Sequence, residues 1–271
     1  MALISESSAL AAPNSIASLR AARSAGKLTW IWPLLFCFLR FPLLALGFVI
    51  ADGLLRARGA ANAGGAAQAF TRYDMPLLAD SLCLAVLGWR LRREGFTFKN
   101  LLAPTWRRLW RDLGRSILIL VPLAAFSALI VVGALLLSSS TNLEVNGPLI
   151  NPFGLPWQVV ISLLIIPVSS GITEELVYRG YALPRLAAFT GKQWQAIAIT
   201  AFGFGLQHVA FLLVDWRLAL VMGVAMTLVG AGFGLAYLAA RQRLLPLILI
   251  HWQADFLALG LAPLVLWVVF K

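Results

Sequence analysis

The sequence predicts an all-α, polytopic transmembrane protein: a helix bundle of about eight spans, or seven, with one basic amphipathic helix at the membrane surface. Two observations lead to this prediction. Of the 271 residues, 61% are hydrophobic and only 12% are charged, whereas a soluble domain has about 45–50% apolar and about 25% charged residues. The apolar residues also form stretches close to the ~20 residues that cross a bilayer. This composition excludes a soluble globular domain and a disordered chain.

The formal net charge of +11 is explained by the membrane. Lys and Arg collect in the cytoplasmic loops of membrane proteins, beside anionic lipid headgroups. No basic run here alternates with aromatic residues that could stack on bases, so we expect the lipid bilayer as a partner and no nucleic acid. The most basic segment, 90–115, is therefore placed in the cytoplasm, together with the N-terminus. We expect an integral protein of a bacterial plasma membrane.

The N-terminal half is expected to hold a tail and three spans. Residues 1–27 are rich in Ala and Ser and predict a flexible cytoplasmic tail, and residues 28–156 follow as the region of spans one to three. In order, this region is expected to contain span one (28–54), a loop (55–72), span two (73–89), the basic amphipathic interfacial helix (90–115), span three (116–137) and an external loop (138–156).

Span one carries an arginine near its middle. Pro33 and Pro42 are expected to kink this span, and Arg40 at that depth must find a partner or reach the interface. We expect an internal ion pair with Asp74 or Asp80 that braces spans one and two, rather than a catalytic role.

The C-terminal part contains four further spans. Span six is rich in glycine, which permits close helix packing. The expected elements are span four as one long helix (157–186), span five (193–214), span six (218–240), span seven (244–259) and a final apolar piece that ends at residue 270.

Ionisable side chains inside a membrane are costly, so each is a candidate for function. Span four contains Glu174, Glu175 and Arg179. Glu175 and Arg179 are four residues apart on one helix face and can pair. Glu174 points about 100° away from Glu175 on the helix, and its own helix offers no obvious partner.

The two histidines of the chain both lie in predicted spans. His208 follows Phe204 by four residues in span five, and His251 precedes Asp255 by four residues in span seven. His251 and Asp255 therefore share one helix face. A lone buried histidine is ordinary, but two on different helices, near two glutamates on a third, predict a site.

These three clusters, in this order, resemble the motifs of the CPBP family of intramembrane proteases. That family includes type II CAAX prenyl endopeptidases, bacteriocin-processing enzymes and abortive-infection proteins. Its motifs are E-E-x-x-x-R, F-x-x-x-H and H-x-x-x-N or H-x-x-x-D. The matching residues are Glu174, Glu175, Arg179, Phe204, His208, His251 and Asp255. The resemblance implies that residues 157–271 form a catalytic helical core.

The resemblance also implies roles for these residues. Glu174 would activate a water molecule with help from His208, and His251 with Asp255 would stabilise the oxyanion or hold a metal. Glu175 and Arg179 would form a supporting pair that holds span four in place beside the site. Glu174, His208 and His251 would also be an adequate set of ligands for a divalent metal such as zinc, so a metal-bound and a metal-free site both stay open.

Asp255 bears on this choice. An asparagine amide could donate a hydrogen bond to an oxyanion, whereas an ionised aspartate would repel it. Asp255 is therefore protonated, orients His251, or binds a cation. This aspartate slightly favours a metal.

The sequence thus predicts an intramembrane endopeptidase that cuts a peptide bond near the membrane. Its substrate would be a prenylated C-terminal peptide, a leader peptide or the tail of a membrane protein. The alternative is a non-proteolytic immunity or scaffold protein with the same fold. A transporter that uses the same buried groups is a weaker third hypothesis, because the sequence shows no inverted repeat.

Overall fold

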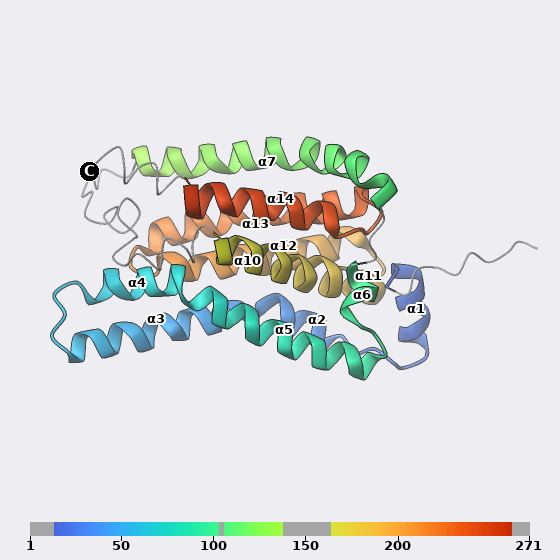
Figure 1. Ribbon diagram of the computed structural model, residues 1–271, viewed down its shortest axis with the longest axis horizontal. Helices are drawn as coiled ribbons and strands as arrows, with labels where there is room; N and C mark the ends of the chain where they lie inside the picture. Colours follow the sequence, from blue (N-terminus) through green and yellow to red (C-terminus); the bar gives the residue numbers. More distant parts are fainter. Residues whose placement is uncertain (1–13, 103–105, 138–163, 262–271) are drawn as a thin grey trace, which may run out of the picture.

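The computed structural model describes residues 14–102, 106–137 and 164–261. Every regular element within these residues is a helix, which confirms the all-α prediction. The helices lie side by side in an elongated bundle (Figure 1). Within the described residues, four helical stretches are long and apolar enough to cross a membrane, and they cover Ile31–Ala57, Leu109–Ile130, Gln193–Leu212 and Trp216–Ala239. A count of seven or eight spans stays a prediction, and the external loop 138–156 and the end of the chain lie outside the described residues.

Part of the segment predicted as a flexible tail forms helix α1, Ile16–Ser24. Ser15 caps its first turn by accepting a hydrogen bond from the amide of Ser18, as N-cap serines do. Ile16 and Leu19 are buried, and α1 packs against α11. The tail prediction was wrong for these residues because two apolar side chains three residues apart are enough to dock a short helix.

The first predicted span is two helices, α2 (Ile31–Phe38) and α3 (Arg40–Ala57). The two helices are separated at Leu39. This interruption is explained by Pro42, which has no N–H to donate to the carbonyl of Phe38. The helix is thus interrupted close to Pro42, although Leu39 keeps helical backbone angles, and Pro33 lies inside α2 without interrupting it. The interruption makes Arg40 the first residue of α3, inside a stretch apolar enough to span the membrane.

Residues 55–72 do not form the predicted loop. Helix α4 covers Ala63–Tyr73 and packs against α3. Asn62 begins it by accepting a hydrogen bond from the amide of Gly65. The segment contains many alanines, which favour helix, and its small residues let the two helices approach closely. The glycines among them had suggested a loop.

The basic segment 90–115 is not one amphipathic helix. Helix α5 (Met75–Glu94) ends at Gly95, whose φ of 78° is left-handed and terminates a helix readily. Three further elements divide the rest of the segment. They are α6 (Phe98–Leu102), a 3₁₀ turn (Trp106–Arg108) and the start of α7 (Leu109–Leu137).

The C-terminal half begins with a helix that changes type without interruption. Its parts are α10 (Ile166–Glu174), a π-helical segment (Glu175–Ala182) and α11 (Leu183–Thr190). One continuous helix was predicted here. The helices that follow are α12 (Gln193–Val209) with a 3₁₀ turn (Ala210–Leu212), α13 (Trp216–Ala239), and α14 (Leu245–Asp255) with a short π-helical end (Phe256–Leu261).

Glycines hold α12 against α13. A Cβ atom added to Gly205 would overlap the carbonyl of Gly223 and the side chain of Thr227 on α13, and one added to Gly230 would press on Phe204. The predicted close packing of span six is therefore confirmed. Helix α10 lies between α14 and α5 (Figure 1), so its end is surrounded by the rest of the bundle.

Candidate active site

The two adjacent glutamates lie where the long helix changes type. Glu174 is the last residue of α10, and Glu175 is the first residue of the π-helical segment. Both are buried. Short π-helical segments are rare and frequently occur at functional sites. The two carboxylates pair with different arginines, as the helical geometry predicted, and both also lie close to His251.

Glu175 is held by two partners. Its Oε1 lies 3.0 Å from Nη1 of Arg179 and 2.8 Å from Nδ1 of His251. The predicted pair with Arg179 is confirmed. Nη2 of Arg179 donates to the carbonyl of Gly230 at 3.0 Å, and its guanidinium also lies 4.7 Å from the ring centre of Phe204. Arg179 thus joins the glutamate helix to α12 and α13.

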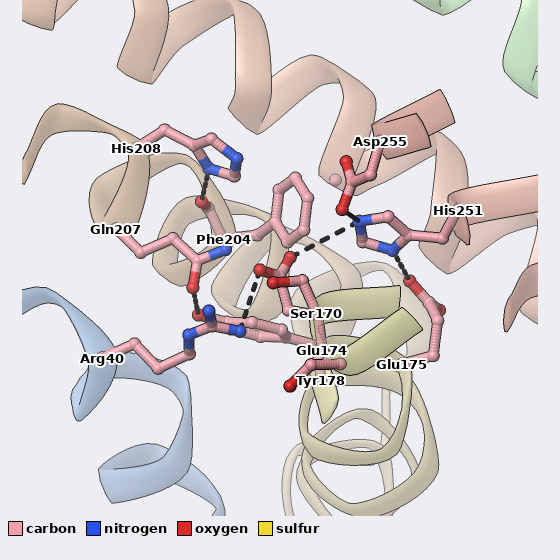
Figure 2. A network of polar contacts seen from close by, with 12 residues as sticks. Arg40, Ser170, Glu174, Glu175, Tyr178, Phe204, Gln207, His208, His251 and Asp255 are labelled. Atoms are coloured by element: carbon pink, nitrogen blue, oxygen red, sulfur yellow. Dashed lines mark hydrogen bonds and ion pairs between the residues drawn. The ribbon is translucent and has the colours of Figure 1, made fainter. Parts of the chain in front are cut away.

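Glu174 faces an arginine from the N-terminal half. Its Oε1 is 2.8 Å from Nη1 of Arg40, and its Oε2 is 3.6 Å from Nε2 of His251. Figure 2 shows Glu174 between these two cationic or potentially cationic side chains. The partner that the local sequence could not provide is therefore supplied by α3.

His251 lies among three carboxylates. Glu175 contacts its Nδ1, while Glu174 and Asp255 lie 3.6 Å and 3.7 Å from its Nε2. The predicted proximity of His251 and Asp255 is confirmed. The side chain of Asp255 is 21% exposed, whereas that of His251 is 6% exposed, so Asp255 marks the more open side of the cluster.

His208 occupies the other side of Phe204. Its Nδ1 lies 2.7 Å from the carbonyl oxygen of Phe204. Because a carbonyl only accepts, Nδ1 carries the hydrogen and Nε2 is an acceptor. The ring of Phe204 lies 4.8 Å from the ring of His208 and 6.0 Å from that of His251 (Figure 2). His208 is close to the cluster, but its hydrogen bond goes to the backbone rather than to Glu174.

Two further polar residues complete the surroundings. Tyr178 donates from its hydroxyl to Oε1 of Gln207 at 3.0 Å, and both side chains are buried. The amide of Gln207 lies beside Glu174. Residue type alone does not rank Gln207 above Gln253, but the structure does, because Gln207 is buried and Gln253 is exposed.

Arg40 and Asp80 are the residues whose place in the site the sequence missed. They form the predicted ion pair at 2.9 Å, but Arg40 also contacts Glu174. The available signal was the arginine near the middle of an apolar span, which must have a partner. A partner for Arg40 was therefore predicted from the sequence, but only one that braces spans one and two.

The donor set does not fit a zinc ion. Among the described residues, no three His, Cys, Asp or Glu side chains are gathered as a metal would require. Oε1 of Glu174 faces the guanidinium of Arg40, and both ring nitrogens of His251 face carboxylates. Nδ1 of His208 is engaged by its own helix. A cation is thus already present where one metal ligand, Glu174, would have to bind.

Comparisons with known proteins agree with the motifs. Residues 156–257 match the family described as Type II CAAX prenyl endopeptidase Rce1-like. No curated protein and no solved structure matches the chain. The matched segment contains both glutamates, both histidines and Asp255, while Arg40 and Asp80 lie outside it. Over residues 156–257, the chain is therefore similar to the CPBP family of intramembrane proteases, in agreement with the three motifs.

Proposed function

We propose that this protein is an intramembrane endopeptidase in which Glu174 activates water to hydrolyse a peptide bond. One observation carries the proposal: Glu174 lies buried within the bundle with Arg40 on one oxygen and His251 near the other. Hydrolysis of an amide needs a base for the water and donors for the oxyanion. This cluster offers both within one small volume.

The proposed reaction uses these groups in order. Oε2 of Glu174 accepts a proton from water, and the water oxygen attacks the carbonyl carbon of the substrate. The carbonyl oxygen becomes an oxyanion, which accepts a hydrogen bond from Nε2 of His251. Nδ1 of this ring also donates, to Glu175, so His251 acts as the imidazolium in this step. The C–N bond then breaks, and the proton held by Glu174 passes to the leaving amine. No step requires a metal.

The remaining residues orient this machinery. Glu175 accepts from Nδ1 of His251 at 2.8 Å, which fixes the ring much as a buried carboxylate orients a catalytic histidine elsewhere. Nε2 of His208 is free to accept a hydrogen bond and assists in holding the water. Asp255 in its acid form adds a second donor to the oxyanion, from the open side of the cluster.

The proposed substrate is a peptide or membrane-protein tail that reaches the site at the bilayer. The name of the matched family supports a prenylated C-terminal peptide first. A leader peptide and an unmodified membrane-protein tail are the other candidates. We place the N-terminus in the cytoplasm and the protein in a bacterial plasma membrane, because the basic residues of 90–115 favour that side.

The test uses two internally quenched peptides with the same C-terminal CAAX sequence, one farnesylated on its cysteine and one unmodified. Wild-type protein in detergent should cleave the farnesylated peptide, and Glu174→Gln should lower kcat by about 10²-fold or more, as loss of a general base does. Glu94→Gln is the matched control, because Glu94 is also buried and ion-paired but belongs to a different cluster with Arg185. Full activity in Glu174→Gln would refute the assignment of the base.

A metal assay belongs to the same experiment. We expect purified wild-type protein to keep its activity in the presence of a zinc chelator and to contain no stoichiometric transition metal. Stoichiometric metal that is lost in Glu174→Gln and in His208→Ala would instead support the metal-bound form of the site.

One observation favours the non-proteolytic alternative. Both glutamates are engaged in ion pairs with arginines, as in a cluster that only stabilises the bundle. A scaffold would tolerate Glu174→Gln together with a neutral residue at position 40. Specific cleavage that disappears in Glu174→Gln alone, in folded protein, would exclude this alternative.

A further inference from the structure

Arg40 is part of a closed ring of polar contacts that begins and ends on α10. The hydroxyls of Ser169 and Ser170 donate to Oδ2 of Asp80 on α5, at 2.7 Å and 3.3 Å. Oδ1 of Asp80 lies 2.9 Å from Nη2 of Arg40 on α3, and Nη1 of Arg40 lies 2.8 Å from Glu174. Helix α10 therefore carries both ends of the ring, and two helices of the N-terminal half close it.

A bracing role explains only half of these contacts. The pair of Arg40 and Asp80 alone would join α3 to α5, and both side chains are 1% exposed. Joining α3 to α5 does not require the second contact, between Nη1 of Arg40 and Glu174. This contact does give the proposed base a fixed direction, because an oxygen held at 2.8 Å leaves only the second oxygen free for water.

The charge of the cluster gives Arg40 a second effect. Each adjacent glutamate has its own arginine: Arg179 for Glu175 and Arg40 for Glu174. Other charged or titratable groups near Glu174 are His251 and Asp255 on α14, His208 on α12, Asp80 and Cys83 on α5, and Tyr178 in the π-helical segment. A buried carboxylate without a cation takes up a proton, and a protonated Glu174 cannot accept one from water.

We propose that Arg40 is a positioning residue of the hydrolysis, which keeps Glu174 in its carboxylate form and aims its free oxygen at the substrate. This inference rests on the proposed function and adds to it a residue from outside the matched segment. It also assigns a purpose to the N-terminal half, which carries no motif: helices α3 and α5 complete the site.

The first test does not need activity. A hydrophobic carbodiimide adds to protonated carboxyl groups and leaves carboxylates unmodified, and peptide mass spectrometry identifies the modified residue. Wild-type protein in detergent at neutral pH should show little modification of Glu174, whereas Arg40→Met should show about tenfold more. Protein denatured in SDS provides the fully reactive reference.

Arg56→Met is the matched control. Arg56 lies on the same helix and pairs with Asp52 at 2.7 Å, but its side chain is 67% exposed. Its loss should leave the reactivity of Glu174 unchanged. If Arg40→Met does not fold, the double variant Arg40→Gln with Asp80→Asn removes the same cation together with its other carboxylate partner and is used instead.

The second test separates positioning from stability in the peptide assay. Arg40→Met should lower kcat by about 10²-fold, as removal of a working base does, with KM within a factor of three of wild type. Arg40→Lys, which keeps the charge, should recover at least a tenth of the wild-type kcat.

The outcomes separate the two proposals. Equal carbodiimide labelling of Glu174 in wild type, Arg40→Met and Arg56→Met would overturn the role of Arg40. Wild-type kcat in folded Arg40→Met would do the same. A labelling difference without cleavage of either peptide would support the effect of Arg40 on Glu174 and refute the proposed function.

Discussion

Arg179→Ala tests the buried ion pair that fixes the helix of the site. Arg179 is fully buried, and its guanidinium lies 3.0 Å from Glu175 and donates to Gly230 at 3.0 Å. Two aromatic rings, those of Phe204 and Phe233, lie 4.7 Å and 4.9 Å from it. The substitution removes all these contacts and leaves the carboxylate of Glu175 without its guanidinium partner.

The expected cost follows from these contacts. Removing one partner of a buried ion pair destabilises by about 3–5 kcal/mol, chiefly because the other charge stays buried. Each ring contact adds about 0.5–2 kcal/mol, but the contributions overlap. We therefore expect Arg179→Ala to lower the free energy of unfolding by at least about 3 kcal/mol. Yield and activity should fall together.

A double variant sharpens this prediction. Arg179→Met with Glu175→Gln removes both charges, keeps most of the volume and leaves an amide oxygen that His251 can contact. Replacing both members of a buried pair is close to neutral. The carbonyl of Gly230 loses only a second donor, because it lies inside α13 and keeps its hydrogen bond within that helix. The double variant should therefore be more stable than Arg179→Ala, although it carries more changes.

The measurement is reversible unfolding in mixed detergent and SDS micelles, followed by tryptophan fluorescence. A free energy of unfolding of Arg179→Ala within about 1 kcal/mol of wild type would refute the buried-pair cost, because that is the behaviour of an exposed pair. A double variant less stable than Arg179→Ala would show that the unpaired charge is not the main cost.

Two further predictions concern the oxyanion and the packing of the site helices. Asp255→Asn should keep kcat within about tenfold of wild type, because an amide also donates a hydrogen bond, whereas Asp255→Ala should lower kcat further. An equal loss of kcat for both protein variants in the peptide assay would contradict the donor role. Gly205→Ala should destabilise by about 1–3 kcal/mol, since its Cβ would overlap α13, whereas Gly53→Ala should stabilise by about 0.5–1 kcal/mol, having nothing within 4 Å. Thermal unfolding of both variants in detergent checks the opposite signs.

The features that the sequence predicted well are local. Glu175 with Arg179 and His251 with Asp255 each lie four residues apart, and the helical repeat alone brings such pairs together. The apolar stretches likewise predict helices because the bilayer leaves few alternatives. The order of the three motifs grouped these pairs into one candidate site. Within it, Nδ1 of His208 bonds the carbonyl of Phe204 rather than Glu174.

The features that the sequence missed depend on weak or distant signals. Helices α1 and α4 are short, and their Ala, Ser and Gly residues do not distinguish a helix from a loop until the packing of α11 and α3 is known. The π-helical segment after Glu174 has no signature of its own. The separation of His208 from His251 depends on the ring of Phe204, whose orientation is set by α13 and by Arg179.

Arg40 shows how far charge balance can replace missing geometry. Asp74 and Asp80 in predicted span two and Glu174 in predicted span four were all possible partners of Arg40. Helical periodicity cannot rank side chains that lie on different helices. The balance of charges could have done so. Arg179 pairs with Glu175 by spacing, which leaves Glu174 as a buried carboxylate without a cation. Arg40 was the arginine left near the middle of a span. Because an unpaired buried charge costs several kcal/mol, the remaining acid and the remaining base are expected to meet, and in the structure they are 2.8 Å apart.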